Sequence, residues 1–482
     1  MLKKRIYQGL TAAGLALAFA ACKTPELVVK NESRNVPAGF TTAAAGATLD
    51  SASTGKLPWK QFFADPNLQL LIESALQNNQ ELNITLQEIE IAKNEVRIRK
   101  GEYLPFVSLG GSAGAEKVGR YTIQGATEEN INIREGRRTP DPLTDFQVGA
   151  FATWEVDIWH KLRNARKAAA LRYLASVEGR NFMVTNVIAE IANSYYELLA
   201  LDNQLAIVRQ SIGIQSNALE LVKLQKESAR TTELAVKRFE AQVQHSRALQ
   251  FKLEQSIVET ENKLNFLAGR YPQPVARNDE SFNTLLPTVI QAGLPTQLLG
   301  NRPDIRQAEQ QLAAAKLDVQ VARASFYPAL RLTSGVGFAA YNPALLLAAP
   351  ESMLFSLAGD AAAPLFNRNG IKALYYNANA TQTQAVYRYE KSLLNAYVEV
   401  TNQLANISNL EKSYDAKAKE VAALNQSVSI SNDLFRAARA EYTEVLFTQR
   451  EALEARFDLI ETRLQQLNAS VNVYRALGGG WK

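Results

Sequence analysis

Apolar residues in one stretch of the chain recur at intervals of three and four positions. The stripe consists of Ile305, Ala308, Leu312, Ala315, Val319, Ala322 and Phe326. A mean spacing of about 3.5 residues predicts an α-helix that packs along a narrow coiled-coil seam. A second stripe lies near the C-terminus, at Leu453, Phe457, Ile460, Leu464, Leu467, Val471 and Tyr474. Helices with such thin stripes need other helices along their whole length, so they are expected to form a wall or a rod.

The first seam belongs to an internal repeat. Residues 92–114 align without a gap with residues 315–337. Each copy is predicted to form a helix that ends near a proline, Pro105 or Pro328, and to continue as a strand. Further pairs are Leu162-Arg163 with Ile371-Lys372, Tyr195 and Glu197 with Tyr397 and Glu399, and Leu267-Ala268-Gly269 with Leu477-Gly478-Gly479. Between the first two pairs the second copy is seven residues shorter, which is two helical turns and keeps every side chain on its face. The chain is therefore predicted to be a tandem duplication.

Each copy also contains a long stretch with almost no helix-breaking residues. Residues 371–438 contain neither proline nor glycine, and residues 163–228 contain only Gly179 and Gly213. A helix of about 65 residues would be roughly 100 Å long, since each residue adds about 1.5 Å. Such helices exceed the core of any single globular domain.

Four strands are predicted after the prolines, at 106–114, 146–154, 329–338 and 353–361. Their length suits tilted strands that cross a bilayer, and they mix Phe, Val and Leu with Ser, Thr and Gly. Four strands cannot close a barrel, because the smallest membrane barrels use about eight. Either several chains contribute to one barrel, or the strands form a small soluble sheet that caps a helical stalk.

The N-terminus has the pattern of an export signal. The basic residues Lys3-Lys4-Arg5 precede an apolar stretch at 9–21, and Ala20-Ala21 stand directly before Cys22, the only cysteine. An apolar stretch this short is typical of a signal peptide, and the small residues resemble a bacterial lipoprotein cleavage box. Cys22 is therefore predicted to carry a covalent lipid as the first mature residue, with a plain secretory signal as the alternative. No later segment has 18 or more consecutive apolar residues, so no membrane-spanning helix is expected.

These observations divide the chain into five parts. They are a signal peptide at 1–21, a lipidated extended segment at 22–58, a first repeat at 59–269, a linker at 270–300 and a second repeat at 301–482.

Composition and charge exclude several classes of function. The net charge of +5 is spread along 482 residues without a basic run interleaved with aromatic residues, so nucleic-acid binding is not expected. The two histidines, His160 and His245, lie on different segments, and lipidation would leave no free cysteine. No nucleophile motif, phosphate loop or metal-ligand cluster is present, so we expect neither an enzyme nor a cofactor.

One segment carries a family resemblance. The residues Asn301-Arg302-Pro303-Asp304-Ile305-Arg306-Gln307-Ala308 resemble the signature of the TolC-like outer-membrane efflux proteins. Residues 65–72, 154–159, 293–295, 442–446 and 449–450 agree with that family, and the similarity extends from about Trp59 to Trp481. Pro303 suits the first position of a helix and Asp304 suits its positive end. We therefore expect Arg302, Pro303 and Asp304 to have a structural role.

The resemblance implies an α+β membrane protein that acts as a homotrimer. Twelve strands, four from each protomer, would close one β-barrel in the lipid of the outer membrane, and twelve helices would form a coiled-coil tunnel across the periplasm. The partners implied are a periplasmic adaptor protein and an inner-membrane RND-type pump. The implied function is a lipid-anchored duct of a tripartite efflux system that exports small molecules.

Two matching turns are expected to reverse the long helices. They are Arg230-Thr231-Thr232-Glu233-Leu234 and Glu441-Tyr442-Thr443-Glu444-Val445, where threonine followed by glutamate suits the start of a helix. The family resemblance implies that the second turn lines a periplasmic gate, formed by Tyr442, Thr443, Glu444 and Phe447. It also implies adaptor contacts at Arg230, Thr231, Thr232, Glu233, Arg439 and Glu441. Three copies of Glu444 would form an acidic ring, and Phe447, where relatives often carry a second acidic residue, would form an apolar one.

Two other functions fit the same pattern. A duct of this kind could serve a protein secretion or metal-export system, although only three methionines are present to relay a soft metal. A helical scaffold anchored by lipid, without a pore, is the second alternative. The scaffold differs from both ducts because it would conduct no ions.

Overall fold

The computed structural model describes residues 24–40, 53–278, 282, 291–364, 368–437 and 439–481. The chain divides into two compact units, each assembled from three chain segments. The first unit consists of Met1–Asn31, Glu90–Leu174 and Gln310–Tyr387, and the second of Glu32–Ile89, Ala175–Glu309 and Arg388–Lys482. Both copies of the repeat contribute to both units.

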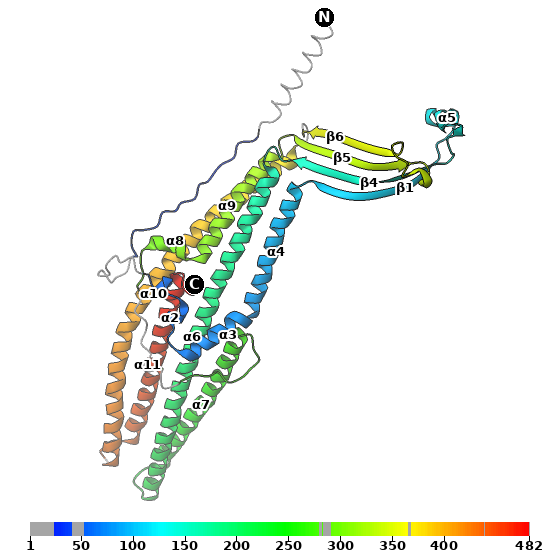
Figure 1. Ribbon diagram of the computed structural model, residues 1–482. Helices are drawn as coiled ribbons and strands as arrows, with labels where there is room; N and C mark the ends of the chain where they lie inside the picture. The colour runs from blue at the N-terminus through cyan, green and yellow to red at the C-terminus, as the bar shows by residue number, and fades with distance from the viewer. Residues whose placement is uncertain are drawn as a thin grey trace. The chain divides into compact units, whose positions relative to one another are not determined.

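A four-stranded antiparallel sheet belongs to the first unit (Figure 1). Its strands are β1 (Phe106–Glu116), β4 (Leu143–Val156), β5 (Ala329–Ala340) and β6 (Met353–Ala362), in the order β1-β4-β5-β6. All four predicted strands are confirmed, and each is slightly longer than predicted. Phe151 pairs with Ser108 on one side and with Gly335 on the other, so the two copies of the repeat join in the middle of the sheet.

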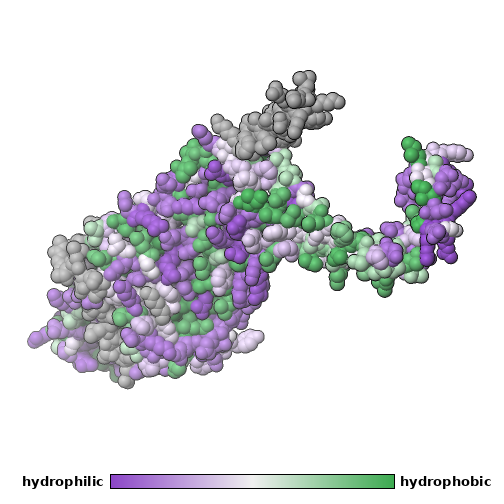
Figure 2. Space-filling model, turned by 45° about the horizontal axis from the view of Figure 1, so that its top comes forward, coloured by the Kyte–Doolittle hydropathy of each residue, from purple (hydrophilic) through white to green (hydrophobic). Residues whose placement is uncertain are grey.

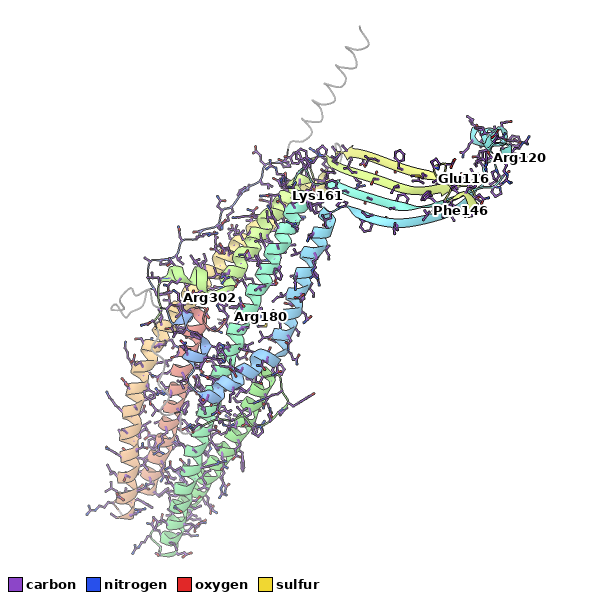
Figure 3. The ribbon with its side chains drawn as sticks, in the orientation of Figure 1. Glu116, Arg120, Phe146, Lys161, Arg180 and Arg302 are labelled. Carbon is purple, nitrogen blue, oxygen red and sulfur yellow. The ribbon has the colours of Figure 1, made fainter. Side chains whose placement is uncertain are left out.

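The sheet exposes apolar side chains to an unusual degree. Leu109 on β1 and Phe355 and Leu357 on β6 are almost fully exposed. In Figure 2 hydrophobic residues run along the strands, and hydrophilic residues gather at their far end around α5 (Ile123–Asn130). Figure 3 labels Lys161, where the sheet passes into a helix, and Glu116 and Phe146 at the opposite end of the strands. Such a band of apolar residues on a sheet needs an apolar surrounding.

The loops between the strands contain elements that the sequence pattern did not predict. The long loop after β1 forms α5 and a small hairpin of β2 (Asn132–Arg134) and β3 (Arg137–Arg138), and the shorter loop forms η4 (Pro343–Leu345). Thr122 caps α5 by accepting a hydrogen bond from the Gly125 N–H at 3.1 Å. These elements are too short and too polar to leave a periodic apolar signal.

The two predicted long helices are present and nearly equal in length. Helix α6 spans Lys161–Glu227 with 67 residues, and α10 spans Asn369–Arg436 with 68 residues. The seven residues that the second copy lacks before Tyr397 are recovered after it, because α10 continues to Arg436 whereas α6 continues from Tyr195 only to Glu227. The two helices therefore match in length while their inner registers differ.

In the second unit the long helices fold back as two hairpins (Figure 1). Helix α6 is followed by α7 (Glu233–Leu267), and α10 by α11 (Tyr442–Ala476). Contacts join α10 to α11 through Arg456 and Asn425, and α6 to α7 through Arg209 and Glu254. The order of the four helices is α10-α11-α6-α7, because α6 and α11 share one apolar core. Its residues on α11 include Ile460, Leu464, Leu467, Val471 and Tyr474, which confirms the seam predicted near the C-terminus.

The second unit also contains short helices. They are η1 (Thr54–Lys56), α2 (Trp59–Phe62), α3 (Pro66–Asn78), η3 (Pro295–Gln297) and α8 (Leu298–Asn301). Helix α3 begins at Pro66 because Asp65 accepts a hydrogen bond from the Asn67 N–H at 2.8 Å. The other carboxylate oxygen of Asp65 accepts a hydrogen bond from the Tyr195 hydroxyl at 2.9 Å. One carboxylate therefore caps α3 and fixes it to the buried face of α6.

The two remaining helices, α4 (Gln80–Tyr103) and α9 (Pro303–Ala324), are repeat counterparts that lead into β1 and β5. Helix α9 begins at Pro303 as expected. Its predicted seam is buried at Ile305, Leu312 and Ala315. The counterpart stripe on α4 is buried only at Leu82 and Thr85.

The ends of α7 and α11 correct one sequence pairing. Gly269 and Gly478 have positive φ angles of 67° and 83° and follow these helices at the same place. A Cβ atom at Gly269 would lie 2.2 Å from the Asn78 carbonyl oxygen, and one at Gly478 would lie 2.6 Å from that of Asn301. Gly269 is therefore the counterpart of Gly478, and the sequence alignment with Gly479 was wrong by one residue. Both positions require glycine for space as well as for φ.

The described part of the N-terminal segment, residues 24–40, has no helix or strand and lies along α10. In the first unit the Val28 carbonyl accepts from Asn379 at 3.1 Å, and the ammonium of Lys30 lies 3.8 Å from the Tyr387 ring centre. In the second unit Phe40 stacks on Tyr397. The segment is thus fixed by side chains of α10 in both units.

Asp157 marks the change from sheet to helix in the first copy. Its carboxylate is buried and accepts hydrogen bonds from the Leu162 N–H at 3.0 Å and the Arg163 N–H at 2.9 Å, and from Arg163 Nε at 3.2 Å. Burial disfavours the charged form, but the two backbone donors and the guanidinium together outweigh it, so the pKa of Asp157 lies below its usual value. Asp157 therefore fixes the first residues of α6.

Asp157→Asn should lower the free energy of unfolding near neutral pH by about 1–2 kcal/mol, because it removes a charged cap. A depressed folded-state pKa stabilises the fold above the ordinary value of 3.8, and this stabilisation is lost as the pH falls through the lower value. The difference between parent and variant should therefore shrink at acidic pH in denaturant unfolding. Asp433→Asn, at an exposed position of α10, is the control. Parallel pH profiles for parent and Asp157→Asn would contradict this role.

Candidate functional site

The first hairpin tip lies between Glu227 and Glu233, the last residue of α6 and the first of α7. Thr232 caps α7 by accepting a hydrogen bond from the Ala235 N–H at 3.4 Å. Glu233 is exposed and lies beside Lys226 and Lys237, and its pKa is lowered, mainly by the hydrogen bond from Lys226. The remaining candidate contacts here, Arg230 and Thr231, lie in the connecting turn. The first tip therefore exposes both acidic and basic side chains to solvent.

The second tip has a different helix start. Helix α11 begins at Tyr442, and its N-cap is Glu441, whose side chain makes no capping hydrogen bond. Thr443 lies inside the helix and does not cap it, so the expectation of two equivalent threonine caps was wrong. The sequence alignment placed Glu444 opposite Glu233, but Glu444 is the third residue of its helix whereas Glu233 is the first of its own.

The gate candidates lie on the first two turns of α11. Glu444 and Phe447 are exposed, Tyr442 and Thr443 are half-buried, and Arg439 and Glu441 are exposed in the turn before them. The guanidinium of Arg450 lies 5.1 Å from the centre of the Phe447 ring, a distance typical of a cation–π contact. Glu444 and Phe447 are therefore the gate candidates whose side chains are exposed on the described surface of this tip.

An apolar cluster joins the two tips. Val445 from α11 is buried against Leu219 and Val222 of α6 and Phe239 of α7, and Tyr442 and Leu446 pack at its edge. The cluster is small, so the tips are held together by few apolar contacts.

The signature segment forms a buried ion cluster in the second unit. Arg302 is buried, and its guanidinium donates to Asp304 at 2.8 and 3.0 Å, to Glu399 at 2.8 Å and to the Ala476 carbonyl at 2.8 Å. Arg475 donates to the second carboxylate oxygen of Glu399 at 2.9 Å. Burial by itself would lower the pKa of Arg302, but the hydrogen bonds and charges of Asp304 and Glu399 together outweigh it, so the pKa is raised. Figure 3 labels Arg302 at the start of α9.

The first copy has a neutral version of this contact. Asn79 is the repeat counterpart of Arg302, and its side-chain amide donates to the Leu267 carbonyl at 2.8 Å. Leu267 ends α7 as Ala476 ends α11. In both copies one side chain thus joins the start of a helix to the end of the returning helix, and only the second copy adds charges.

Pro105 and Pro328 lie where helices pass into strands. Trp159 Nε1 donates to the Pro328 carbonyl at 2.7 Å, and the Trp159 ring stacks on Tyr327. Near Pro105, Trp154 Nε1 donates to the Tyr103 carbonyl at 3.1 Å. The Trp154 indole thus satisfies a carbonyl at the C-terminal end of α4, and the Trp159 indole bonds the carbonyl just before β5.

Several structural residues were not identified from the sequence. Asp157 is one example, and Glu399, which pairs with Arg302, was noted only as a repeat match. Cys22 lies outside the described residues, so its lipidation stays a prediction. Within the described ranges, no group of three or more His, Cys, Asp or Glu side chains is placed to hold a metal ion. No helix in the described part of the chain is long and apolar enough to cross a membrane.

Comparison with known proteins agrees with this architecture. The family model of the outer membrane efflux protein matches residues 71–270 and 294–479. The pyoverdine export outer membrane protein OpmQ of Pseudomonas aeruginosa is 30% identical over 449 residues, which cover 92% of this chain and 91% of OpmQ. The cation efflux protein CusC of Escherichia coli is 26% identical, with 97% and 98% covered. The solved structure of the MtrE outer membrane channel of Neisseria gonorrhoeae superposes with a TM-score of 0.82 at 23% identity, covering 95% of this chain and 99% of MtrE.

Long helical hairpins, together with a four-stranded sheet that exposes apolar side chains, are typical of the class of outer-membrane channel proteins. The chain belongs to the outer membrane efflux protein family. It is an outer-membrane efflux channel protein of the TolC-like kind, and the expected family and fold class are confirmed. The relatives are named as export and efflux proteins, which are transport proteins.

Arg302→Met should lower the free energy of unfolding by about 2–4 kcal/mol, because it leaves the carboxylates of Glu399 and Asp304 without their buried partner. Thermal or denaturant unfolding of the purified full chain measures the effect. Arg172→Met is the matched control, since Arg172 pairs with Asp318 at the surface and should contribute less than about 1 kcal/mol. Equal effects of the two substitutions would contradict a structural role specific to Arg302.

Proposed function

We propose that three copies of this chain close one duct through the outer membrane, as the outer component of a tripartite efflux system that exports small molecules. The duct transports and has no catalytic step of its own. One observation carries the proposal: equivalent apolar positions of the two repeat copies are buried in one copy and exposed in the other. A ring in which the copies alternate would bury both sets.

The first pair of faces is on α9 and α4. The face of α9 that carries Ala314 packs against α6, as the ion pair between Asp318 and Arg172 indicates. Ala314 is only 1% exposed, whereas its counterpart on α4, Ile91, is 68% exposed. Ile91 also belongs to a stripe with Ile84 and Ile98, spaced by seven residues and all exposed. A heptad stripe of isoleucines is typical of a helix seam.

The second pair of faces is on α11 and α7. Ile460 is 7% exposed in the core shared with α6, whereas its counterpart Phe251 on α7 is 66% exposed. Leu467 is likewise buried, and its counterpart Val258 is exposed. Phe251 and Val258 are seven residues apart and therefore lie on one face.

The complementary surface is on α10, the counterpart of α6. Leu394 and Val398 are exposed on α10. With Tyr195 and Tyr397 aligned, they correspond to Ala192 and Tyr196, which are buried in the core of the second unit. If α10 of one protomer packs on α4 and α7 of the next, the seam between protomers repeats the seam inside each chain.

The sheet supports the same arrangement. Strands β1 and β6 each have one hydrogen-bonded neighbour, so both edges offer backbone groups to another strand. Pairing of β6 with β1 of the next protomer would close a barrel of twelve strands, and its outer face would present the exposed apolar residues to lipid.

The hairpin tips would face the periplasmic partners. We assign adaptor contacts to Arg230, Thr231, Thr232, Glu233, Arg439 and Glu441, and the pump of the RND type would lie beyond the adaptor. The gate would consist of Tyr442, Thr443, Glu444 and Phe447, whose exposed members, Glu444 and Phe447, come close to their copies only in a trimer. A lipid on Cys22 would hold the mature chain at the membrane.

A double substitution tests the seam. Phe251→Asp with Val258→Asp places carboxylates where the seam would be dry, so the trimer should dissociate into monomers. Native mass measurement of the purified protein should show trimers for the parent and for His245→Asp, a control at an exposed position on another face of α7. A monomeric parent, or a double variant that remains trimeric, would contradict the proposed assembly.

Planar-bilayer recording tests the duct and its gate. The parent should conduct ions, which distinguishes it from a scaffold without a pore. Phe447→Ala should raise the single-channel conductance several-fold, because a ring of apolar side chains excludes water from a narrow passage. Leu234→Ala, at an exposed apolar position of the first tip, should leave it unchanged. Equal conductance of the parent and Phe447→Ala would refute the gate role of Phe447.

A further inference from the structure

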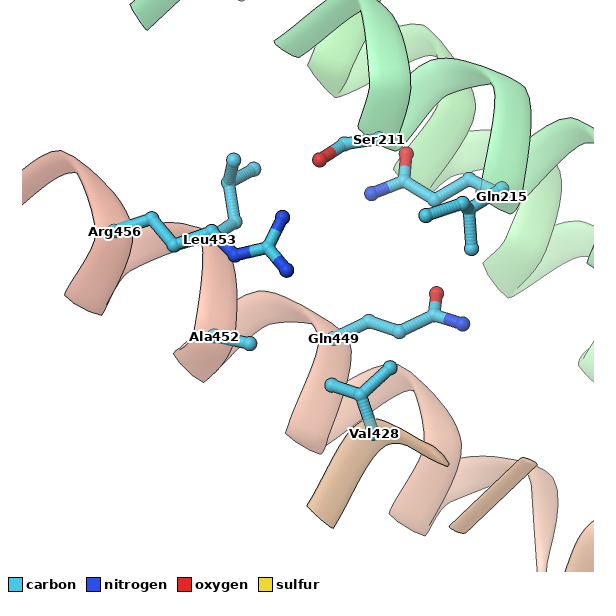
Figure 4. A pocket seen from close by; sticks show the side chains of 8 residues that line it. Ser211, Gln215, Val428, Gln449, Ala452, Leu453 and Arg456 are labelled. Carbon is cyan, nitrogen blue, oxygen red and sulfur yellow. The ribbon is translucent and has the colours of Figure 1, made fainter. Parts of the chain in front are cut away.

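A small polar pocket interrupts the contact between the two hairpins (Figure 4). It lies where α6 faces α10 and α11, above the tips, and its volume is about 40 Å³. Its lining combines polar side chains of Ser211, Gln215, Gln449 and Arg456 with apolar ones of Ile214, Val428, Ala452 and Leu453. In Figure 4 the side chains of Gln215, Gln449 and Arg456 extend into the space between the helices.

Gln449 is the informative residue of this pocket. It is 7% exposed, and neither its amide nitrogen nor its amide oxygen has a hydrogen-bond partner among the described residues. Gln215 is 1% exposed, and its side-chain oxygen accepts a hydrogen bond from the Ser246 hydroxyl at 2.7 Å. Its amide nitrogen is therefore the group that can donate a hydrogen bond inside the pocket. A buried amide without partners costs about 1–3 kcal/mol, so a binding partner is required.

The pocket occupies a break in the coiled-coil seam of α11. Gln449 and Arg456 are seven residues apart, so they fall on the face that carries Val445 on one side and Ile460 on the other. Val445 belongs to the small apolar cluster of the tips, and Ile460 belongs to the large core. A polar layer thus separates two apolar clusters along one pair of helices.

At the level of the pocket, direct hydrogen bonds connect the two helices within each hairpin. Ser246 of α7 bonds Gln215 of α6, and Arg456 Nε of α11 donates to Asn425 Oδ1 of α10 at 2.9 Å. Between the hairpins the Gln449 amide makes no such bond to any described group. The hairpins are therefore internally fixed at this level, and the junction between them is the weaker contact.

We propose that this pocket binds ordered water and acts as a hydrated joint between the two hairpins. Between the joint and the tips, the hairpin of α10 and α11 separates from the hairpin of α6 and α7. Water supplies both the donor and the acceptor that the Gln449 amide needs, and the volume suffices for about two or three molecules. The groups of the joint stay hydrated when the hairpins part. Separation of the tips then exposes only the small cluster around Val445.

This inference rests on the proposed role of the second tip as a gate, but its test requires no conductance. A high-resolution structure of the parent should contain water within hydrogen-bond distance of the Gln449 amide and of Gln215 or Arg456. The Gln449→Leu structure should lose that water. A parent structure in which Gln449 bonds directly to Gln215, with no water between them, would overturn the site.

Distance measurements test the movement. Labels on cysteines introduced at Glu227 and Arg436, both exposed at the tips, would report tip separation in a full chain that carries Cys22→Ser. The parent should show a short and a long distance, and Gln449→Leu should reduce the long-distance population at least several-fold, because an apolar side chain makes separation costly.

Two further variants complete the test. Gln449→Met, which keeps the length of the side chain, should act like Gln449→Leu. Gln465→Leu makes the same change on the exposed face of α11, where Gln465 bonds Glu461, and should leave the distances unchanged. Distances in Gln449→Leu and Gln449→Met that match the parent, with both variants folded, would refute the joint. If the parent shows both distances but conducts no ions, the proposed duct is refuted and the proposed joint is not.

Discussion

A helix with a narrow apolar stripe is stable only when another helix covers that stripe along its length. This constraint determines the second unit, where α11 packs between α10 and α6, and α6 between α11 and α7. It also leaves the outer faces of α10 and α7 with uncovered apolar residues, among them Leu394 and Phe251. One chain has two such faces because it is built from two equivalent halves. A closed ring is the arrangement in which no face remains without a partner.

The periodic part of this fold could be predicted from the sequence. The seam at Ile305, Leu312 and Ala315 identified a helix because a repeated apolar spacing is a strong signal over several turns. The four strands were found through the prolines and the repeat. Helix α5 and the hairpin of β2 and β3 were missed, because elements of a few polar residues leave no such pattern.

The sites were predicted less completely, for physical reasons. A buried cluster such as Arg302, Glu399 and Arg475 joins residues far apart in the chain, and spacing says nothing about such contacts. Glu444 and Phe447 were identified through a family resemblance rather than through chemistry. Thr443 shows the limit of a local motif: a Thr-Glu pair suits a helix start, yet α11 begins one residue before it. Which residue begins a helix depends on how the preceding turn packs.

Gly269 and Gly478 join each returning helix to the start of another through backbone atoms. A contact made by carbonyl groups and glycine does not depend on the identity of neighbouring side chains. The two halves of the chain can therefore accumulate different side chains on every exposed surface while the geometry of their junctions stays the same. Duplication followed by divergence can therefore preserve these helix junctions while each half acquires its own partner surface.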